Sequence, residues 1–165
     1  MKEIIEKLTE LGYTISTMES CTGGCLANAI TNIEGASEVL KFSAVTYSNE
    51  FKIKMGVSSE VIDKYSVYSM ETAREMALNI SKFTNSNIGI GITGKLNRAD
   101  KNNNFGEDNE VFICIYDGEF HNLSVKVSNQ TRKENKEEVI NFIVEKLGEI
   151  INEKNKQRKL VHKRQ

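Results

Sequence analysis

The spacing of apolar residues predicts a chain in which helices and strands alternate. Near the start, four apolar residues recur at helical intervals: Ile4, Ile5, Leu8 and Leu11. Gly12 follows them as a natural end to that helix. Residues 13–18 (YTISTM) then predict a strand, 25–33 (CLANAITNI) a short helix, and 42–47 (FSAVTY) a second strand.

The middle of the chain continues this alternation. Ser69 is a suitable N-cap for a helix whose apolar face consists of Met70, Ala73, Ala77, Ile80 and Phe83. Residues 87–93 (NIGIGIT) predict a strand, and its glycines indicate that another element packs close to the backbone. Residues 110–127 predict a hairpin that turns at Asp117 and Gly118.

The last predicted element is a helix. Thr131 and Glu134 form a capping box, T-x-x-E, at its start. Its inward face consists of Val139, Phe142, Ile143, Leu147 and Ile150. Helices that alternate with strands, together with one hairpin, predict a layered α/β fold with a mixed sheet in a single domain.

Composition and charge fit a globular protein. The chain has 165 residues, of which 39% are hydrophobic and 27% charged, as expected for one domain with its own core. A net charge of −1 gives no reason to expect nucleic acid as a partner. Because no apolar run has membrane-spanning length and the first helix is amphipathic, we expect a cytoplasmic protein without membrane association.

The C-terminal end differs from the rest of the chain. We place the domain at residues 1–152 and a basic tail at 153–165. The tail's cations are Lys154, Lys156, Arg158, Lys159, Lys163 and Arg164. Its low apolar content predicts a solvated, frayed segment, with an electrostatic contact to an acidic partner as the alternative.

Three cysteines, Cys21, Cys25 and Cys114, are an odd and sparse set, which argues against a disulfide framework. No paired histidines or cysteines elsewhere suggest a metal site. We therefore expect neither metal nor cofactor.

The stretch TMESCTGG, residues 17–24, carries the first candidate chemistry. A glycine-rich turn between a strand and a helix exposes backbone N–H groups that suit a phosphate or an oxyanion. Ser20 and Thr22 add hydroxyls, and Gly23 and Gly24 permit close approach of a ligand. On these residues alone, an ordinary tight turn explains the pattern equally well.

A second motif, TYSNEFKIKMGV over 46–57, supplies Tyr47, Asn49 and Lys52 just after a predicted strand. The order of ESCTGG, a short helix, G-[AS]-S, YSNEFK, GV and a helix after VYS resembles the nicotinamide-nucleotide amidase family, also known as the CinA C-terminal domain. The resemblance covers most of residues 1–150.

The resemblance implies a three-layer α/β/α sandwich that commonly forms homodimers. It also implies cofactor-free hydrolysis of the carboxamide of nicotinamide mononucleotide (NMN), a small-molecule nucleotide, to nicotinic acid mononucleotide and ammonia. By position, Ser20 corresponds to the nucleophile, assisted by Tyr47 and Lys52. The expected substrate-binding residues are Thr22, Gly23, Gly24, Asn49, Thr93 and Arg132.

This chemistry imposes a condition on Lys52. A serine hydroxyl needs a base, and only a neutral lysine can serve. Because the ordinary lysine pKa is about 10.4, lowering it to near 7 requires roughly 4 kcal/mol from burial or a nearby cation. Tyr47 could relay the proton or donate to developing charge. The alternative for these two residues is structural: Lys52 is then a solvated surface lysine and Tyr47 a half-buried strand residue. A separate alternative makes Cys21, rather than Ser20, the nucleophile.

One segment departs from the family. After GITG, the sequence KLNRADKNNNFGEDNEVFI replaces a glycine-rich stretch and introduces Lys95 and Arg98. Three hypotheses follow: an NMN amidohydrolase, an amidohydrolase of another amide selected by Lys95 or Arg98, and a non-enzymatic nucleotide-binding or regulatory dimer.

Overall fold

The computed structural model describes residues 1–97 and 106–164. Five strands form one sheet in the order β2-β1-β3-β4-β5. Their bounds are β1 Ile15–Glu19, β2 Leu40–Val45, β3 Ile88–Gly94, β4 Glu110–Tyr116 and β5 Phe120–Lys126. β1 is parallel to β2 and β3, whereas β4 is antiparallel to β3 and β5. The predicted mixed sheet is therefore confirmed.

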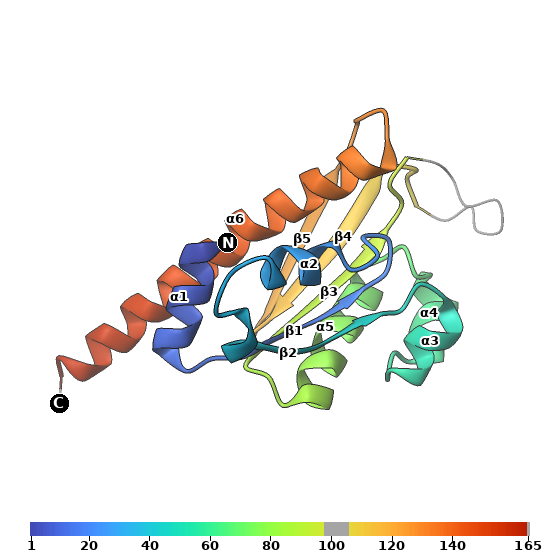
Figure 1. The fold of residues 1–165 in the computed structure, drawn as a ribbon. Helices are drawn as coiled ribbons and strands as arrows, with labels where there is room; N and C mark the ends of the chain where they lie inside the picture. The colour runs from blue at the N-terminus through green and yellow to red at the C-terminus, as the bar shows by residue number, and fades with distance from the viewer. Residues whose placement is uncertain (98–105, 165) are drawn as a thin grey trace.

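Helices cover both faces of the sheet (Figure 1). They are α1 Lys2–Leu11, α2 Cys25–Thr31, α3 Asn49–Lys54, α4 Ser59–Tyr65, α5 Met70–Thr84 and α6 Arg132–His162, with a 3₁₀ turn at Ala36–Glu38. The helices α1, α2 and α6 share the larger apolar core with one face, and α5 packs on the other with α4 against it. The architecture is a three-layer α/β/α sandwich in a single domain, as expected.

The helix ends predicted from the sequence are present in the structure. Gly12 closes α1 in the left-handed conformation, with φ of 68°. The hydroxyls of Ser69 and Thr131 cap α5 and α6 by accepting hydrogen bonds from the backbone N–H groups of Thr72 and Glu134. These caps satisfy donors that the first helical turn leaves unpaired.

The glycines of β3 allow α5 to lie directly on the sheet. A Cβ on Gly89 would lie 2.2 Å from the carbonyl oxygen of Ala77, and one on Gly91 would lie 2.3 Å from that of Ala73. Real Cβ atoms do not approach backbone oxygens so closely. The close packing predicted from the Ile/Gly alternation is confirmed.

Several elements differ from the sequence prediction. α3 and α4 were not expected, and β2 ends at Val45, so Tyr47 lies beyond the strand. Phe83 was placed on the buried face of α5 but is 65% exposed; its ring lies tilted against that of Phe42, with 5.4 Å between the centroids. It falls in the last turn of α5, which ends at Thr84.

The basic segment predicted as a frayed tail is instead a continuation of α6, which runs to His162 and extends past α1 (Figure 1). Lys154 and Arg158 fix this part to the body: Lys154 Nζ lies 3.0 Å from Asp117 Oδ2, and Arg158 Nη1 donates to the carbonyl of Leu11 at 3.1 Å. None of the helices in residues 1–97 and 106–164 is long and apolar enough to cross a membrane.

Candidate active site

Ser20 lies at the carboxyl end of the parallel part of the sheet. It is the first residue after β1, is 8% exposed, and donates its backbone N–H to the carbonyl of Ile92 on β3 at 2.9 Å. The carboxyl ends of parallel strands are the usual location of ligand sites in α/β proteins. The position of Ser20 therefore fits a residue that meets a ligand.

The turn after Ser20 depends on its two glycines. Gly23 and Gly24 have φ of 60° and 98°, a region that residues with a Cβ rarely adopt. The N–H of Gly23 closes the turn on the carbonyl of Ser20 at 3.0 Å. Among residues 1–97 and 106–164, no acceptor takes the N–H groups of Thr22 and Gly24. They are free to donate to a ligand.

Glu19 organises this turn and was not identified from the sequence. Its side chain is fully buried, and Oε1 accepts from the hydroxyl of Thr22 at 2.7 Å and from the N–H of Leu26 at 2.9 Å. Oε2 accepts from the N–H of Ala27 at 3.0 Å. The carboxylate therefore caps α2 from the preceding strand. The available signal was an acidic residue at the end of an otherwise uncharged strand, just before a helix.

Lys52 contacts Ser20 directly. Ser48 caps α3 by accepting from the N–H of Phe51, and Lys52 lies on the inner side of this helix, only 2% exposed. Its Nζ donates to Ser20 Oγ at 2.9 Å and to the carbonyl of Thr46 at 2.8 Å. The structure thus brings together two residues 32 positions apart in the sequence.

Burial is the main reason that the pKa of Lys52 is lowered to about 8. No carboxylate of the described chain forms an ion pair with it. Burial also raises the pKa of the neighbouring Cys21 thiol to about 12, although the charges of Arg132 and Lys52 act in the opposite direction. Near neutral pH, Ser20 therefore has a base within reach, whereas Cys21 stays a protonated thiol.

Tyr47 and Arg132 meet at the edge of the site. Tyr47 is 66% exposed, and its Oη accepts a hydrogen bond from Arg132 Nη2 at 3.3 Å. Arg132 is the first residue of α6 and is close enough to Cys21 to affect its pKa. Neither side chain hydrogen-bonds to Ser20 or Lys52 in the described chain.

Two of the predicted binding residues, Thr22 and Thr93, donate their hydroxyl protons to other groups of the protein. The hydroxyl of Thr22 is fully buried against Glu19, and that of Thr93 donates to the carbonyl of Val67 at 2.7 Å. Their part in binding a ligand stays a prediction. Asn49 is exposed at the start of α3 and leaves its amide open to solvent.

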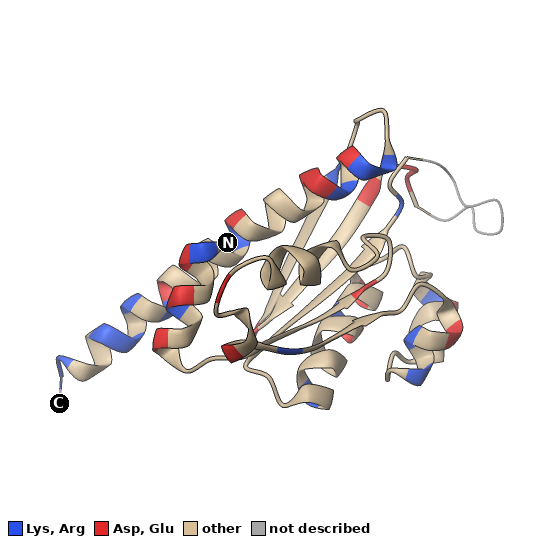
Figure 2. Cartoon of the chain, in the orientation of Figure 1, with Lys and Arg blue, Asp and Glu red and all other residues tan. Residues whose placement is uncertain are grey.

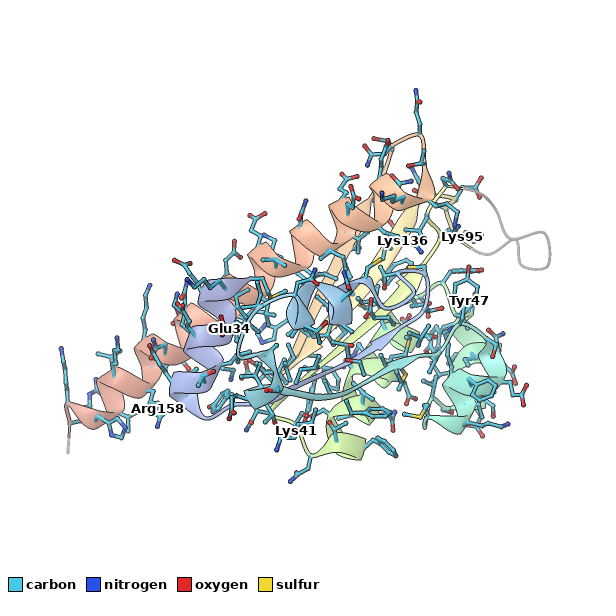
Figure 3. The ribbon with its side chains drawn as sticks, viewed as in Figure 1. Glu34, Lys41, Tyr47, Lys95, Lys136 and Arg158 are labelled. Atoms are coloured by element: carbon cyan, nitrogen blue, oxygen red, sulfur yellow. The ribbon has the colours of Figure 1, made fainter. Side chains whose placement is uncertain are left out.

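Lys95 does not project into solvent. It is buried, and its Nζ lies 4.6 Å from the ring centroid of Tyr68. Figure 3 shows Lys95 at the same end of the molecule as Tyr47 and Lys136. Arg98, the other cation considered from the sequence, lies outside the described residues.

One group of potential metal ligands occurs in the part of the chain that the structure describes. Asp117, Glu119 and His121 gather at the β4–β5 turn, at the other end of the sheet from Ser20. Asp117 Oδ2 lies 3.0 Å from the ammonium of Lys154, and its Oδ1 lies 3.1 Å from His121. The group therefore already has a cationic partner and takes no part in the Ser20 site.

The fold and the site together define an α/β protein with a buried serine–lysine pair at the carboxyl edge of a mixed sheet. Residues 1–151 match the model of the CinA C-terminal domain, and the chain belongs to this family.

Curated relatives bear general names. The chain is 46% identical over 96 residues to a "Putative competence-damage inducible protein" of Clostridium kluyveri, covering 57% of this chain and 23% of the relative. It is 44% identical over 111 residues to a "CinA-like protein" of Flavobacterium psychrophilum, covering 66% of this chain and 26% of the relative. The chain thus matches about a quarter of the length of these relatives.

Solved structures share the fold. A CinA superfamily protein from Klebsiella pneumoniae superposes with a TM-score of 0.85 at 22% identity, covering 92% of this chain and 95% of that one. A competence/damage inducible protein from Agrobacterium tumefaciens gives a TM-score of 0.81 at 29% identity, covering 91% and 92%.

Proposed function

We propose that this protein is an amidohydrolase that converts the carboxamide of nicotinamide mononucleotide to the carboxylate, with release of ammonia. The observation that carries the proposal is the hydrogen bond between Lys52 Nζ and Ser20 Oγ inside a nearly solvent-free environment. Burial lowers the pKa of Lys52 to about 8, so roughly a tenth of the molecules hold it neutral at pH 7.

The first half-reaction begins with neutral Lys52. It takes the proton of Ser20 as Oγ attacks the carboxamide carbon, which gives a tetrahedral intermediate with negative charge on the carbonyl oxygen. The intermediate collapses when the C–N bond breaks, and the protonated Lys52 gives its proton to the departing nitrogen. Ammonia leaves, and the acyl group remains on Ser20 as an ester.

The second half-reaction repeats these steps with water. Lys52 takes a proton from a water molecule, hydroxide adds to the ester carbon, and the proton returns to Ser20 Oγ as the ester bond breaks. The sum is amide plus water giving carboxylic acid plus ammonia, so the enzyme is restored without a cofactor.

The turn after Ser20 and the edge residues Tyr47 and Arg132 are suited to stabilise the oxyanion and to bind the substrate. The free N–H groups of Thr22 and Gly24 are suited to stabilise the oxyanion. Arg132, held against Tyr47, provides a positive charge at the rim for an anionic substrate. Homodimerisation, which the family resemblance implies, belongs to the same proposal.

Ammonia release from NMN tests the proposal. Ser20→Ala and Lys52→Ala should each lower kcat by a factor of about 100 or more, because each removes one half of the nucleophile–base pair. Lys54→Ala is the matched control, because Lys54 lies on the same helix but is exposed and paired with Glu50. Its turnover should stay within about twofold of wild type.

The pH dependence gives a second readout in the same assay. Because Lys52 acts as a base when neutral, kcat/KM should rise with pH and level off above about 8. Absence of turnover by the folded wild-type protein would exclude NMN as substrate. Turnover that survives in both Ser20→Ala and Lys52→Ala would exclude this pair as the catalytic machinery.

A further inference from the structure

Thr46 links the two partners of the candidate site through its backbone. It follows β2 directly and is only 2% exposed. Its N–H donates to the carbonyl of Glu19, the residue before Ser20, at 2.9 Å, and its own carbonyl accepts from Lys52 Nζ at 2.8 Å. This one residue therefore fixes the base relative to the strand that carries the nucleophile.

The side chain of Thr46 is harder to explain than its backbone. Its Oγ1 is buried and has no hydrogen-bond partner among residues 1–97 and 106–164. A buried hydroxyl without a partner has lost its hydrogen bonds to water and regained none, which costs stability. Valine fills nearly the same volume without this cost, so packing alone does not account for an oxygen at this position.

The hydrogen bonds of Lys52 indicate what the oxygen does. The ammonium has three N–H groups, of which one points to Ser20 Oγ and one to the carbonyl of Thr46. When Lys52 loses the proton that faces Ser20, the lone pair left behind faces Ser20 Oγ, as the proposed reaction requires. The amine keeps this orientation only if its two remaining N–H groups have acceptors other than Ser20.

Thr46 offers both acceptors. Its carbonyl already binds one N–H, and its unpartnered hydroxyl oxygen is only a few covalent bonds away. The charged residues lie mainly on the helices and few lie on the strands of the sheet (Figure 2). Cys21 is the titratable group that acts on the pKa of Lys52, and burial keeps its thiol protonated near neutral pH. The carboxylate of Glu19 is taken up by Thr22 and the start of α2.

We propose that Thr46 is a positioning residue for Lys52: its carbonyl and its hydroxyl together accept the two N–H groups of the neutral amine and direct the lone pair at Ser20. The inference rests on the proposed amidase function for the reaction, whereas the activation of Ser20 can be measured without NMN. The buried oxygen, which forms no bond in the described chain, is then retained for catalysis rather than for the fold.

Thr46→Val separates this role from a structural one. The variant removes the unpartnered hydroxyl and keeps the carbonyl, so the midpoint of urea unfolding should rise by roughly 0.5–1 M. Its kcat with NMN should nevertheless fall by about tenfold or more, with KM within about twofold of wild type. Thr46→Ser, which restores the hydroxyl, should return kcat to within about threefold of wild type. A variant Thr46→Val that loses stability together with turnover would give the hydroxyl a structural role and overturn the inference.

The pH profile distinguishes orientation from a change in the pKa of Lys52. The loss of kcat/KM in Thr46→Val should be the same across the profile, because the hydroxyl does not bond to the ammonium in the structure. A loss that disappears at high pH would assign the effect to the pKa and overturn the positioning role.

Thr17→Val is the matched control. Thr17 is also buried, but its hydroxyl has a partner, since it donates to Ser43 Oγ at 2.7 Å. Removal of this hydroxyl should lower the urea midpoint and leave kcat within about twofold of wild type. The two threonine variants should therefore change stability in opposite directions, and only Thr46→Val should slow the reaction.

A fluorophosphonate probe measures the activation of Ser20 without NMN. Ser20 Oγ attacks phosphorus, the new P–O bond replaces the P–F bond as fluoride leaves, and Lys52 takes the hydroxyl proton. Wild type should be labelled, Ser20→Ala should not, and Thr46→Val should react about tenfold more slowly than wild type.

The probe and NMN together separate this inference from the amidase proposal. If labelling follows the expected order but NMN is not hydrolysed, the positioning role of Thr46 stands and the proposed substrate fails. If NMN is hydrolysed but Thr46→Val is labelled as fast as wild type, the positioning role is wrong. A folded wild type that neither reacts with the probe nor hydrolyses NMN would overturn both.

Discussion

At the scale of the residue, Lys52 shows how one buried side chain can link catalysis to stability. Its ammonium donates two hydrogen bonds but pairs with no carboxylate of residues 1–97 and 106–164, so its charged form carries most of the cost of leaving water. The same cost makes the neutral amine accessible near neutral pH. A property that destabilises the fold is therefore the property that the proposed reaction requires.

Replacement of this residue should reveal the cost. Lys52→Met should raise the free energy of unfolding at pH 7 by roughly 1–3 kcal/mol, because the protonated side chain costs more in the buried site of the folded state than in the solvated unfolded state. Since the folded pKa of about 8 lies below the unfolded value, wild type should gain stability as pH rises from about 8 to 10.5. Urea unfolding across this range should show the advantage of the variant shrinking. A difference that does not vary with pH would contradict the lowered pKa.

At the scale of the element, the contact between α5 and β3 holds the sheet in the geometry that the site needs. β3 supplies the carbonyl of Ile92 that fixes Ser20, and its glycines let α5 approach on the opposite face. A change in how α5 packs on β3 should therefore change the position of Ser20 through the sheet.

A methyl group at this contact should be costly. Gly91→Ala places a Cβ 2.3 Å from the carbonyl of Ala73, and we expect a loss of roughly 2–3 kcal/mol in the free energy of unfolding. The control is Gly148→Ala in α6, where the nearest atom, Ile4 Cδ1, is 4.0 Å away. That change should stabilise by roughly 0.5–1 kcal/mol through helix propensity. Urea denaturation followed by circular dichroism measures both, and equal stability of the two variants would exclude close packing as the cause.

At the scale of the whole molecule, the two parts of α6 contact different regions of the protein. Its first part packs on the sheet together with α1 and α2, within residues 1–151 that match the family. Its last part extends beyond that match and is held by Lys154 and Arg158. These contacts lie far from Ser20, at the other end of the sheet.

Removal of the last part should therefore spare the site. A chain ending at Asn152 should release ammonia from NMN within about twofold of the full chain, and should lose roughly 1–2 kcal/mol of stability with the lost contacts. The double variant Lys154→Ala/Arg158→Ala should reproduce most of that loss in urea unfolding. A truncated chain that folds but loses turnover would show that the end of α6 supports the site.

Local patterns were enough to predict much of the fold. The helix ends at Gly12, Ser69 and Thr131, the hairpin at Asp117 and the close approach to β3 all depend on interactions within a few residues or on the absence of a side chain. Two short helices, α3 and α4, escaped prediction because segments of six and seven residues are too short to show a helical period of apolar residues.

The residue types of the candidate site also came from the sequence, through the motifs that hold Ser20, Tyr47 and Lys52. What only the tertiary structure decided is which atoms meet. It joined Lys52 to Ser20 and turned the hydroxyls of Thr22 and Thr93 inward. Burial and distance between elements remote in sequence control these outcomes, because the pKa of a lysine and the partner of a hydroxyl depend on what the fold packs around them.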